Sequence, residues 1–273
     1  MGTVPLQFIV QGYPAYAYTG GKRYDPGLPT IVFIHGAALD HSVWQWQSRY
    51  FAHHGYSVIA ADLPAHGRSP GAARTSIGEM ADWGAALIEA AGKERAHVVG
   101  QSMGALVALD MALRHRARVE RLVLVGAALP MAVNEAFLSA ARDDSAAGFD
   151  MQSTWGHARH SALSQSPVPG SALLAASRQL NARARPGVQY ADLNACNDYR
   201  PPSDALRGLD MPTLVLSGRR DQMTGPKAGP ALAAQIPGAR LVELDAGHSM
   251  MVEAPRATLE ALRQFLAAPE AGA

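Results

Sequence analysis

A run of β-branched residues in this chain passes directly into a helical pattern through a serine flanked by glycines. The stretch VVGQSMGALVALDMA, residues 98–112, places Ser102 between Gly100 and Gly104. A strand that enters a helix so abruptly needs small neighbours, because the two elements pass close together. The serine hydroxyl is then expected at the carboxyl end of a sheet, beside helix N–H groups that favour negative charge. The junction predicts an α/β sheet with a reactive serine at its ligand-binding edge.

The same alternation of strand and helix recurs along the chain. Short apolar runs typical of buried strands lie at 30–36, 56–67, 96–100, 119–127, 211–221 and 239–248. Helical patterns lie between or after them, at 43–55, 77–92, 103–116, 227–238 and 254–268. Such alternation is typical of a parallel sheet covered by helices on both faces. The predicted fold class is therefore α/β.

A segment without strand patterns interrupts this order. Residues 130–205 contain helical pieces broken by SQSPVPGS and RPPSD. We expect this segment to form a helical cap between two strands, with 1–129 and 206–273 forming the core domain. Its apolar positions can bury one face over the serine and enclose a pocket. These positions are Leu129, Met131, Phe137, Leu138, Trp155, Leu173 and Leu174.

Composition excludes several classes of partner. The formal net charge is +1, which gives no electrostatic case for a nucleic acid or an acidic membrane surface. The single cysteine, Cys196, cannot form an internal disulfide and fits a reducing compartment. No apolar run approaches the roughly 18 residues of a membrane span. We expect a soluble cytoplasmic protein with a small-molecule ligand; the sequence does not indicate its oligomeric state.

A nucleophilic serine needs a base, and the base needs an orienting acid. His248 follows a late strand in DAGHSM, at the same predicted sheet edge, and is the candidate base. Asp221 ends the preceding strand at that edge and is the candidate acid. Asp245 and Asp210 are rivals for this role. However, Asp245 is too close in sequence to His248 to reach its Nδ1 easily, and Asp210 precedes its strand.

The reaction of a serine with an acyl group also needs donors for a developing oxyanion. The backbone amide of Met103, directly after the serine, is one candidate donor. The amide of Ala37, in the loop HGAALD after the 30–36 strand, is the other. The pattern of histidines and acids implies no metal and no organic cofactor. Candidate pocket residues near these groups are His35, Met250, Met251 and Trp155.

These motifs together resemble those of the α/β-hydrolase superfamily. FIHGAALDHSVW is similar to its oxyanion loop, GQSMGA to its nucleophile turn, LSGRRDQMT to its acid loop and DAGHSMMVEAP to its histidine loop. ADLPAHGRS resembles its D-x-x-G-x-G-x-S turn, with Ala65 in place of the first glycine. The resemblance covers nearly all of the chain. It implies an eight-stranded, mostly parallel sheet with a helical cap.

The expected function is that of a serine hydrolase. Ser102, His248 and Asp221 would cleave small to medium carboxylic esters through an acyl-enzyme. Within enzymes, the alternatives are a carbon–carbon bond hydrolase or lactonase of aromatic-compound breakdown, and a cofactor-free haloperoxidase. From another class, the alternative is a ligand receptor that uses the cap as a lid and turns over slowly. Serine at position 102 argues against the related haloalkane dehalogenases and epoxide hydrolases, which use aspartate there.

Overall fold

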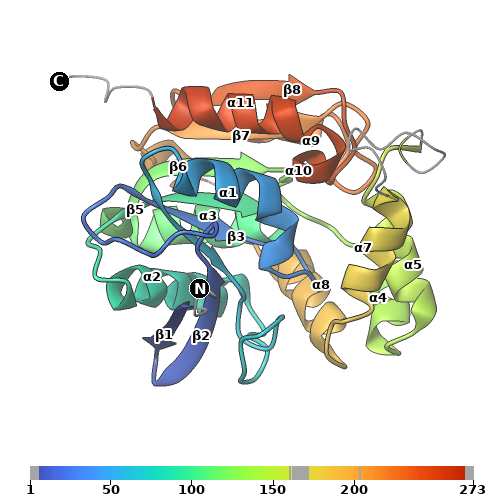
Figure 1. Cartoon of the computed structure of the whole chain (residues 1–273). Helices are drawn as coiled ribbons and strands as arrows, with labels where there is room; N and C mark the ends of the chain where they lie inside the picture. Colours follow the sequence, from blue (N-terminus) through green and yellow to red (C-terminus); the bar gives the residue numbers. More distant parts are fainter. Residues whose placement is uncertain (1–5, 160, 162–171, 203, 268–273) are drawn as a thin grey trace.

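The structure, a computed structural model, describes residues 6–159, 161, 172–202 and 204–267. Within them, an eight-stranded sheet is flanked by helices (Figure 1). The strands are β1 (Leu6–Val10), β2 (Tyr13–Tyr18), β3 (Thr30–Ile34), β4 (Ser57–Ala61), β5 (Ala96–Gln101), β6 (Val119–Val125), β7 (Thr213–Gly218) and β8 (Arg240–Leu244).

The helices divide into those that flank the sheet and those of the cap. The flanking helices are α1 (Gln45–Ala52), α2 (Ile77–Ala90), α3 (Met103–Arg114), α9 (Ala228–Ala233), α10 (Met250–Glu253) and α11 (Pro255–Leu266). The cap helices are α4 (Glu135–Arg142), α5 (Ala146–Trp155), α7 (Leu173–Asn181) and α8 (Val188–Asp198). Short 3₁₀ turns span His41–Trp44, Arg116–Arg118 and Ala205–Gly208.

The sheet has the order β1-β2-β4-β3-β5-β6-β7-β8. The pairs from β4-β3 to β7-β8 are parallel, whereas β1-β2 and β2-β4 are antiparallel. The predicted α/β class and the mostly parallel eight-stranded sheet are thus confirmed. Because the parallel strands run in one direction, the loops after β3, β5, β7 and β8 meet at one edge.

The sheet separates two apolar layers, and β3 contributes side chains to both. Val32 and Ile34 pack in the layer that contains side chains of α2 and α3. Ile31 and Phe33 pack in the opposite layer, with side chains of α1 and α11. Successive side chains of a strand point to opposite faces, so a strand covered on both sides is apolar at every position.

The first two strands were not among the segments identified from the sequence pattern. They form a hairpin whose turn residues, Gln11 and Gly12, have φ angles of 50° and 83°. Two positive φ angles are characteristic of a type I′ turn, which matches the twist of paired strands. Pro14 obscures the pattern, since proline is rare within sheets. It is tolerated because only Ala17 and Tyr18 of β2 pair with β4.

The cap helices lie between β6 and β7 in the sequence and gather at one side of the sheet domain (Figure 1). All four fall inside the 130–205 segment predicted to form the cap. Contacts of α4 with α5 and α8, and of α5 with α7, hold them together. In the described part of the chain, no helix has both the length and the apolar character needed to cross a bilayer.

His97, near the start of β5 and away from Ser102, yields a prediction about acid stability. The residue is 4% exposed, and burial together with Arg121 and Arg95 lowers the pKa of its side chain to about 4. In the unfolded state, His97 binds a proton below about pH 6.5, whereas in the folded state it binds one only below about pH 4. The folded pKa is lowered, so this contribution to stability is complete above pH 6.5 and is lost as the pH falls towards 4.

We therefore expect the free energy of unfolding to fall between pH 7 and pH 4, with His97 contributing on the order of 3 kcal/mol. Urea unfolding of the wild type and of His97→Leu at several pH values measures this share. A slope that is identical in the two proteins would contradict it. Part of the slope should persist in the variant, because burial and the neighbouring His66 also lower the pKa of His35 to about 4.

Candidate active site

The turn between β5 and α3 holds Ser102 in a strained conformation, with φ 54° and ψ −119°. A side chain on Gly100 would place its Cβ 2.0 Å from the Gly104 carbonyl oxygen. A side chain on Gly104 would place its Cβ 2.4 Å from the carbonyl oxygen of Ile34. The absence of a side chain at both positions therefore allows the first turn of α3 to pack directly against β5 and the end of β3. Ser102 occupies the N-cap of α3, but its hydroxyl makes no capping hydrogen bond there.

His248 and Asp221 lie together at the same edge of the sheet. The imidazole Nδ1–H of His248 donates to Oδ2 of Asp221 at 2.8 Å, and both side chains are buried. Asp221 also accepts from the backbone amides of Met223 and Thr224 and from the Thr224 hydroxyl. Burial alone would raise the pKa of Asp221, but His248 and the hydrogen bonds from His248 and Thr224 lower it to about 2. The acid is therefore ionised at neutral pH.

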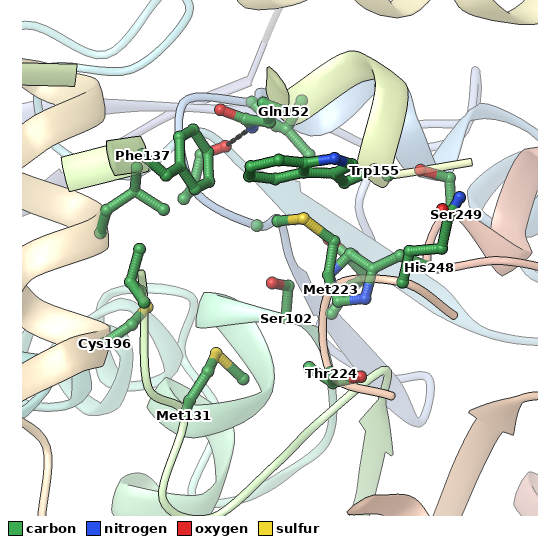
Figure 2. A pocket seen from close by; sticks show the side chains of 18 of the residues that line it. Ser102, Met131, Phe137, Gln152, Trp155, Cys196, Met223, Thr224, His248 and Ser249 are labelled. Carbon is green, nitrogen blue, oxygen red and sulfur yellow. Dashed lines mark hydrogen bonds between the residues drawn. The ribbon is translucent and has the colours of Figure 1, made fainter. Parts of the chain in front are cut away.

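The other ring nitrogen of His248 is left to accept a proton. Its Nε2 is buried and has no hydrogen-bond partner among the described residues. His248 and Ser102 face the same cavity (Figure 2). With Nδ1 protonated against Asp221, Nε2 carries the lone pair that a general base needs.

The two rival acids point elsewhere. Asp245 forms an ion pair with Arg220 at 2.7 Å, and its side chain is 62% exposed. Asp210 pairs with Arg116. Neither carboxylate is among the partners of the His248 ring.

The loop after β3 lies against the serine. A Cβ on Gly36 would come within 3.3 Å of the Ser102 Cβ, and Ala37 lines the cavity. In the described part of the chain, the backbone N–H groups of Ala37 and Met103 donate to no other residue. This arrangement can offer two amide donors to an oxygen bound beside Ser102.

His35 stabilises this loop through hydrogen bonds and does not line the cavity. The ring is fully buried; its Nδ1–H donates to the Gly36 carbonyl at 2.8 Å, and the Leu63 amide donates to Nε2 at 3.1 Å. These contacts fit a neutral ring, in agreement with its lowered pKa. The expectation that His35 forms part of the pocket is therefore corrected: it joins the β3 loop to the turn after β4.

Met250 and Met251 are also corrected as pocket residues. They follow His248 closely, but α10 turns their side chains into the apolar layer shared with Trp44 and Phe33. Both are at most 1% exposed and neither lines the cavity. Closeness in sequence placed them at the site, whereas the direction of a short helix removed them from it.

The cavity beside Ser102 has a volume of about 100 Å³ and lies between the sheet edge and the cap (Figure 2). Trp155 lines it as predicted, with Met131 and Phe137 from the segment expected to cover the site. Amides and hydroxyls add a polar part to the wall, and no described residue that lines the cavity is a lysine or arginine. The side chains not predicted from sequence include Met223, Gln152, Asn181 and Cys196.

Only some of these residues carried a signal in the sequence. Met223 stands two positions after Asp221, so its neighbourhood was predictable. Gln152 and Cys196 come from cap helices, and nothing in their local patterns indicates which side faces the site. Burial raises the pKa of the Cys196 thiol, which makes this residue a packing group rather than a nucleophile.

Comparison with known proteins gives a consistent family. The sequence model of the alpha/beta hydrolase fold matches residues 29–255. A pimeloyl-[acyl-carrier protein] methyl ester esterase of Aromatoleum aromaticum is 32% identical over 250 residues, which cover 83% of this chain and 94% of that protein. The solved structure of an enol-lactonase from Burkholderia xenovorans has a TM-score of 0.83 at 24% identity, covering 96% of this chain and 100% of its own.

A further match is confined to part of a longer protein. The dihydrolipoyllysine-residue acetyltransferase component of the acetoin cleaving system of Cupriavidus necator is 39% identical over 131 residues. These residues make up 46% of this chain and 33% of that protein. The chain therefore spans about a third of that relative, but nearly the full length of the esterase.

Proposed function

The chain belongs to the alpha/beta hydrolase family, whose model matches residues 29–255, and from this premise we propose that it is a serine hydrolase of small, uncharged carboxylic esters. The observation that carries the proposal is the 2.8 Å hydrogen bond between His248 and Asp221, at the cavity that Ser102 lines. It leaves Nε2 of His248 with a lone pair and without a described partner. A strained serine, a histidine held through Nδ1 and an ionised acid at one sheet edge form the constellation of acyl transfer.

In the proposed first half of the reaction, Ser102 Oγ attacks the ester carbonyl carbon. His248 Nε2 takes the hydroxyl proton, and the Asp221 carboxylate stabilises the imidazolium that results. The carbonyl oxygen becomes an oxyanion that accepts hydrogen bonds from the amides of Ala37 and Met103. The C–O bond to the leaving group then breaks, and His248 returns the proton to the departing alcohol.

In the second half, water replaces the alcohol. His248 takes a proton from the water, whose oxygen attacks the acyl carbon and again forms an oxyanion. When the bond from carbon to Ser102 Oγ breaks, His248 returns the proton to the serine and the carboxylic acid leaves. Every bond formed or broken in this proposed cycle involves only Ser102, His248, water and the ester.

The wall of the cavity favours an uncharged acyl group. Leu39, Met131, Phe137, Trp155 and Met223 supply apolar surface, and the described wall contains no lysine or arginine to pair with a carboxylate. A carboxylate without a cationic partner in such a site regains only part of the hydration free energy that it loses. The relative from Aromatoleum aromaticum, named for the hydrolysis of a methyl ester, supports ester chemistry. A lactone is an internal ester that the same steps would open.

The size of the cavity predicts the preference for chain length. We expect 4-nitrophenyl esters from acetate to hexanoate to be cleaved with a higher kcat/KM than the palmitate ester, without activation at an oil–water interface. Each methylene that fits should contribute up to about 0.8 kcal/mol, or roughly fourfold in kcat/KM, until the wall is reached. Steady-state kinetics over the series measures this profile. A maximum at palmitate with interfacial activation would make the protein a lipase.

The same panel separates the alternatives. The mono-4-nitrophenyl ester of succinic acid matches the valerate ester in length but carries a carboxylate, so it should react at least tenfold more slowly. Preference for the acidic ester would contradict the uncharged substrate. Cleavage of a vinylogous 1,5-diketone but of no ester would indicate a carbon–carbon bond hydrolase. Binding of acyl compounds without steady product release would indicate a receptor.

A further inference from the structure

Two cap side chains form hydrogen bonds with a single peptide unit of the loop after β3. The Gln152 amide Nε2 of α5 donates to the Ala37 carbonyl oxygen at 2.6 Å (Figure 2). The Asp192 carboxylate of α8 accepts from the Ala38 backbone N–H at 2.8 Å. The C=O and N–H of a trans peptide point in opposite directions. The cap therefore holds the Ala37–Ala38 peptide from both ends.

The conformation of this peptide needs such support. The Leu39 amide donates to the Gly36 carbonyl oxygen at 3.3 Å, which closes a four-residue turn. Ala38 has a φ of 55°, whereas Ala37 is not among the described residues with positive φ. This pattern defines a type II turn, whose third position ordinarily favours glycine. The more common type I turn would rotate the Ala37–Ala38 peptide and turn its carbonyl to the opposite side.

The Asp192 side chain is itself held in place by a further hydrogen bond. Asp192 is fully buried, and its Oδ2 also accepts from His66 Nε2–H at 2.8 Å. The other ring nitrogen of His66 lies 2.9 Å from the Pro64 carbonyl, so both ring nitrogens face acceptors. Burial lowers the pKa of His66, but the Asp192 carboxylate raises it above its usual value.

The orientation of the Gln152 side-chain amide is likewise fixed by a second hydrogen bond. The amide oxygen of Gln152 accepts from Gln189 Nε2 at 2.6 Å, so its nitrogen faces Ala37. Both Gln152 and Gln189 come from the cap, on α5 and α8. The cap thus presents a fixed donor and a fixed acceptor to the loop.

We infer that Gln152 and Asp192 are positioning residues for the oxyanion hole. The oxyanion would meet the N–H of the preceding Gly36–Ala37 peptide, which shares the Ala37 Cα with the Ala37–Ala38 peptide. Holding the latter in its type II orientation therefore restrains Ala37 and the direction of its N–H. The cap then affects the chemical step as well as access to the cavity. This inference rests on the proposed function, because it presupposes that Ser102 is the nucleophile.

The test compares four variants with 4-nitrophenyl butyrate as substrate and butaneboronic acid as a probe of the tetrahedral state. Gln152→Met removes the donor to Ala37 at nearly constant volume, and Asp192→Leu removes the acceptor for Ala38. Asp192→Asn keeps an oxygen acceptor for Ala38. Tyr199→Phe is the matched control, since the hydroxyl of Tyr199, directly after α8, donates to Asp110 of α3 at 3.0 Å, away from the Ala37–Ala38 peptide bonds to Gln152 and Asp192.

Removal of a whole oxyanion donor costs about 10²- to 10³-fold in kcat, and displacement should cost less. We expect Gln152→Met and Asp192→Leu to lower kcat roughly 10- to 100-fold while KM changes less than about threefold. The boronic acid should bind more weakly by the same factor as the loss in kcat/KM. Asp192→Asn should retain kcat within about fivefold, and Tyr199→Phe within about twofold.

The inference is wrong if folded Gln152→Met keeps the wild-type kcat, or if its loss lies in KM alone. Gln152→Met decides the matter by itself should Asp192→Leu fail to fold. The Ser102→Ala variant tests the proposed function separately from the positioning role of Gln152 and Asp192. If Ser102→Ala is inactive and Gln152→Met is fully active, only the positioning role fails. If Ser102→Ala is fully active, the proposed function fails and the inference fails with it.

Discussion

Replacing Ser102 by alanine is expected to lower kcat for 4-nitrophenyl butyrate by roughly 10³- to 10⁶-fold. The variant keeps the backbone turn but loses the oxygen that would form the acyl-enzyme. The remaining amides of Ala37 and Met103 can still stabilise an oxyanion formed by water, so residual activity above the uncatalysed rate is expected. Stopped and steady-state assays over several enzyme concentrations measure the loss.

Covalent labelling gives an independent readout of the same prediction. A fluorophosphonate should modify the wild type on Ser102, as located by peptide mass spectrometry, and should not modify Ser102→Ala. Ser249 provides the matched control, because it also lines the cavity but has an ordinary φ of −88°. Ser249→Ala should still be labelled at Ser102. Near-wild-type turnover by Ser102→Ala, or labelling that disappears in Ser249→Ala instead, would contradict the proposed nucleophile.

Parts of the molecule that depend on short-range sequence were predictable. The turn at Ser102 follows from its two glycines, because strand and helix must pass within contact distance there. Asp221 and His248 each follow a predicted strand, and parallel strands bring their carboxyl ends to one edge. Their meeting therefore follows from topology even though they are 27 positions apart in the sequence.

Parts that depend on the packing of distant elements were not. The contact of Gln152 with Ala37 spans 115 positions, and that of Asp192 with Ala38 spans 154. No local pattern indicates which face of a cap helix meets the loop. Met250 shows the opposite failure, since it is near His248 in sequence but α10 directs it into the core. The periodicity that predicts a helix does not predict where that helix points.

Asp221→Asn is expected to fold like the wild type and to lose about 10⁴-fold in kcat, with little change in KM. The backbone amides of Met223 and Thr224 both donate to Oδ1, at 2.8 and 2.9 Å. Only the oxygen of an asparagine can accept these two bonds, so its NH₂ group must occupy the Oδ2 position beside His248 Nδ1. The ring must then carry its proton on Nε2, which leaves no lone pair to receive the serine proton.

The matched control for this prediction is Asp245→Asn. Asp245 lies three residues before His248, but it forms an exposed ion pair with Arg220, and such pairs contribute about 0–1 kcal/mol to stability. Its loss should leave kcat within about twofold. Circular dichroism and thermal unfolding of both variants establish that any loss of activity is not a loss of fold. The reverse ranking, with Asp245→Asn inactive and Asp221→Asn active, would reassign the acid to Asp245 and require the histidine loop to rearrange before catalysis.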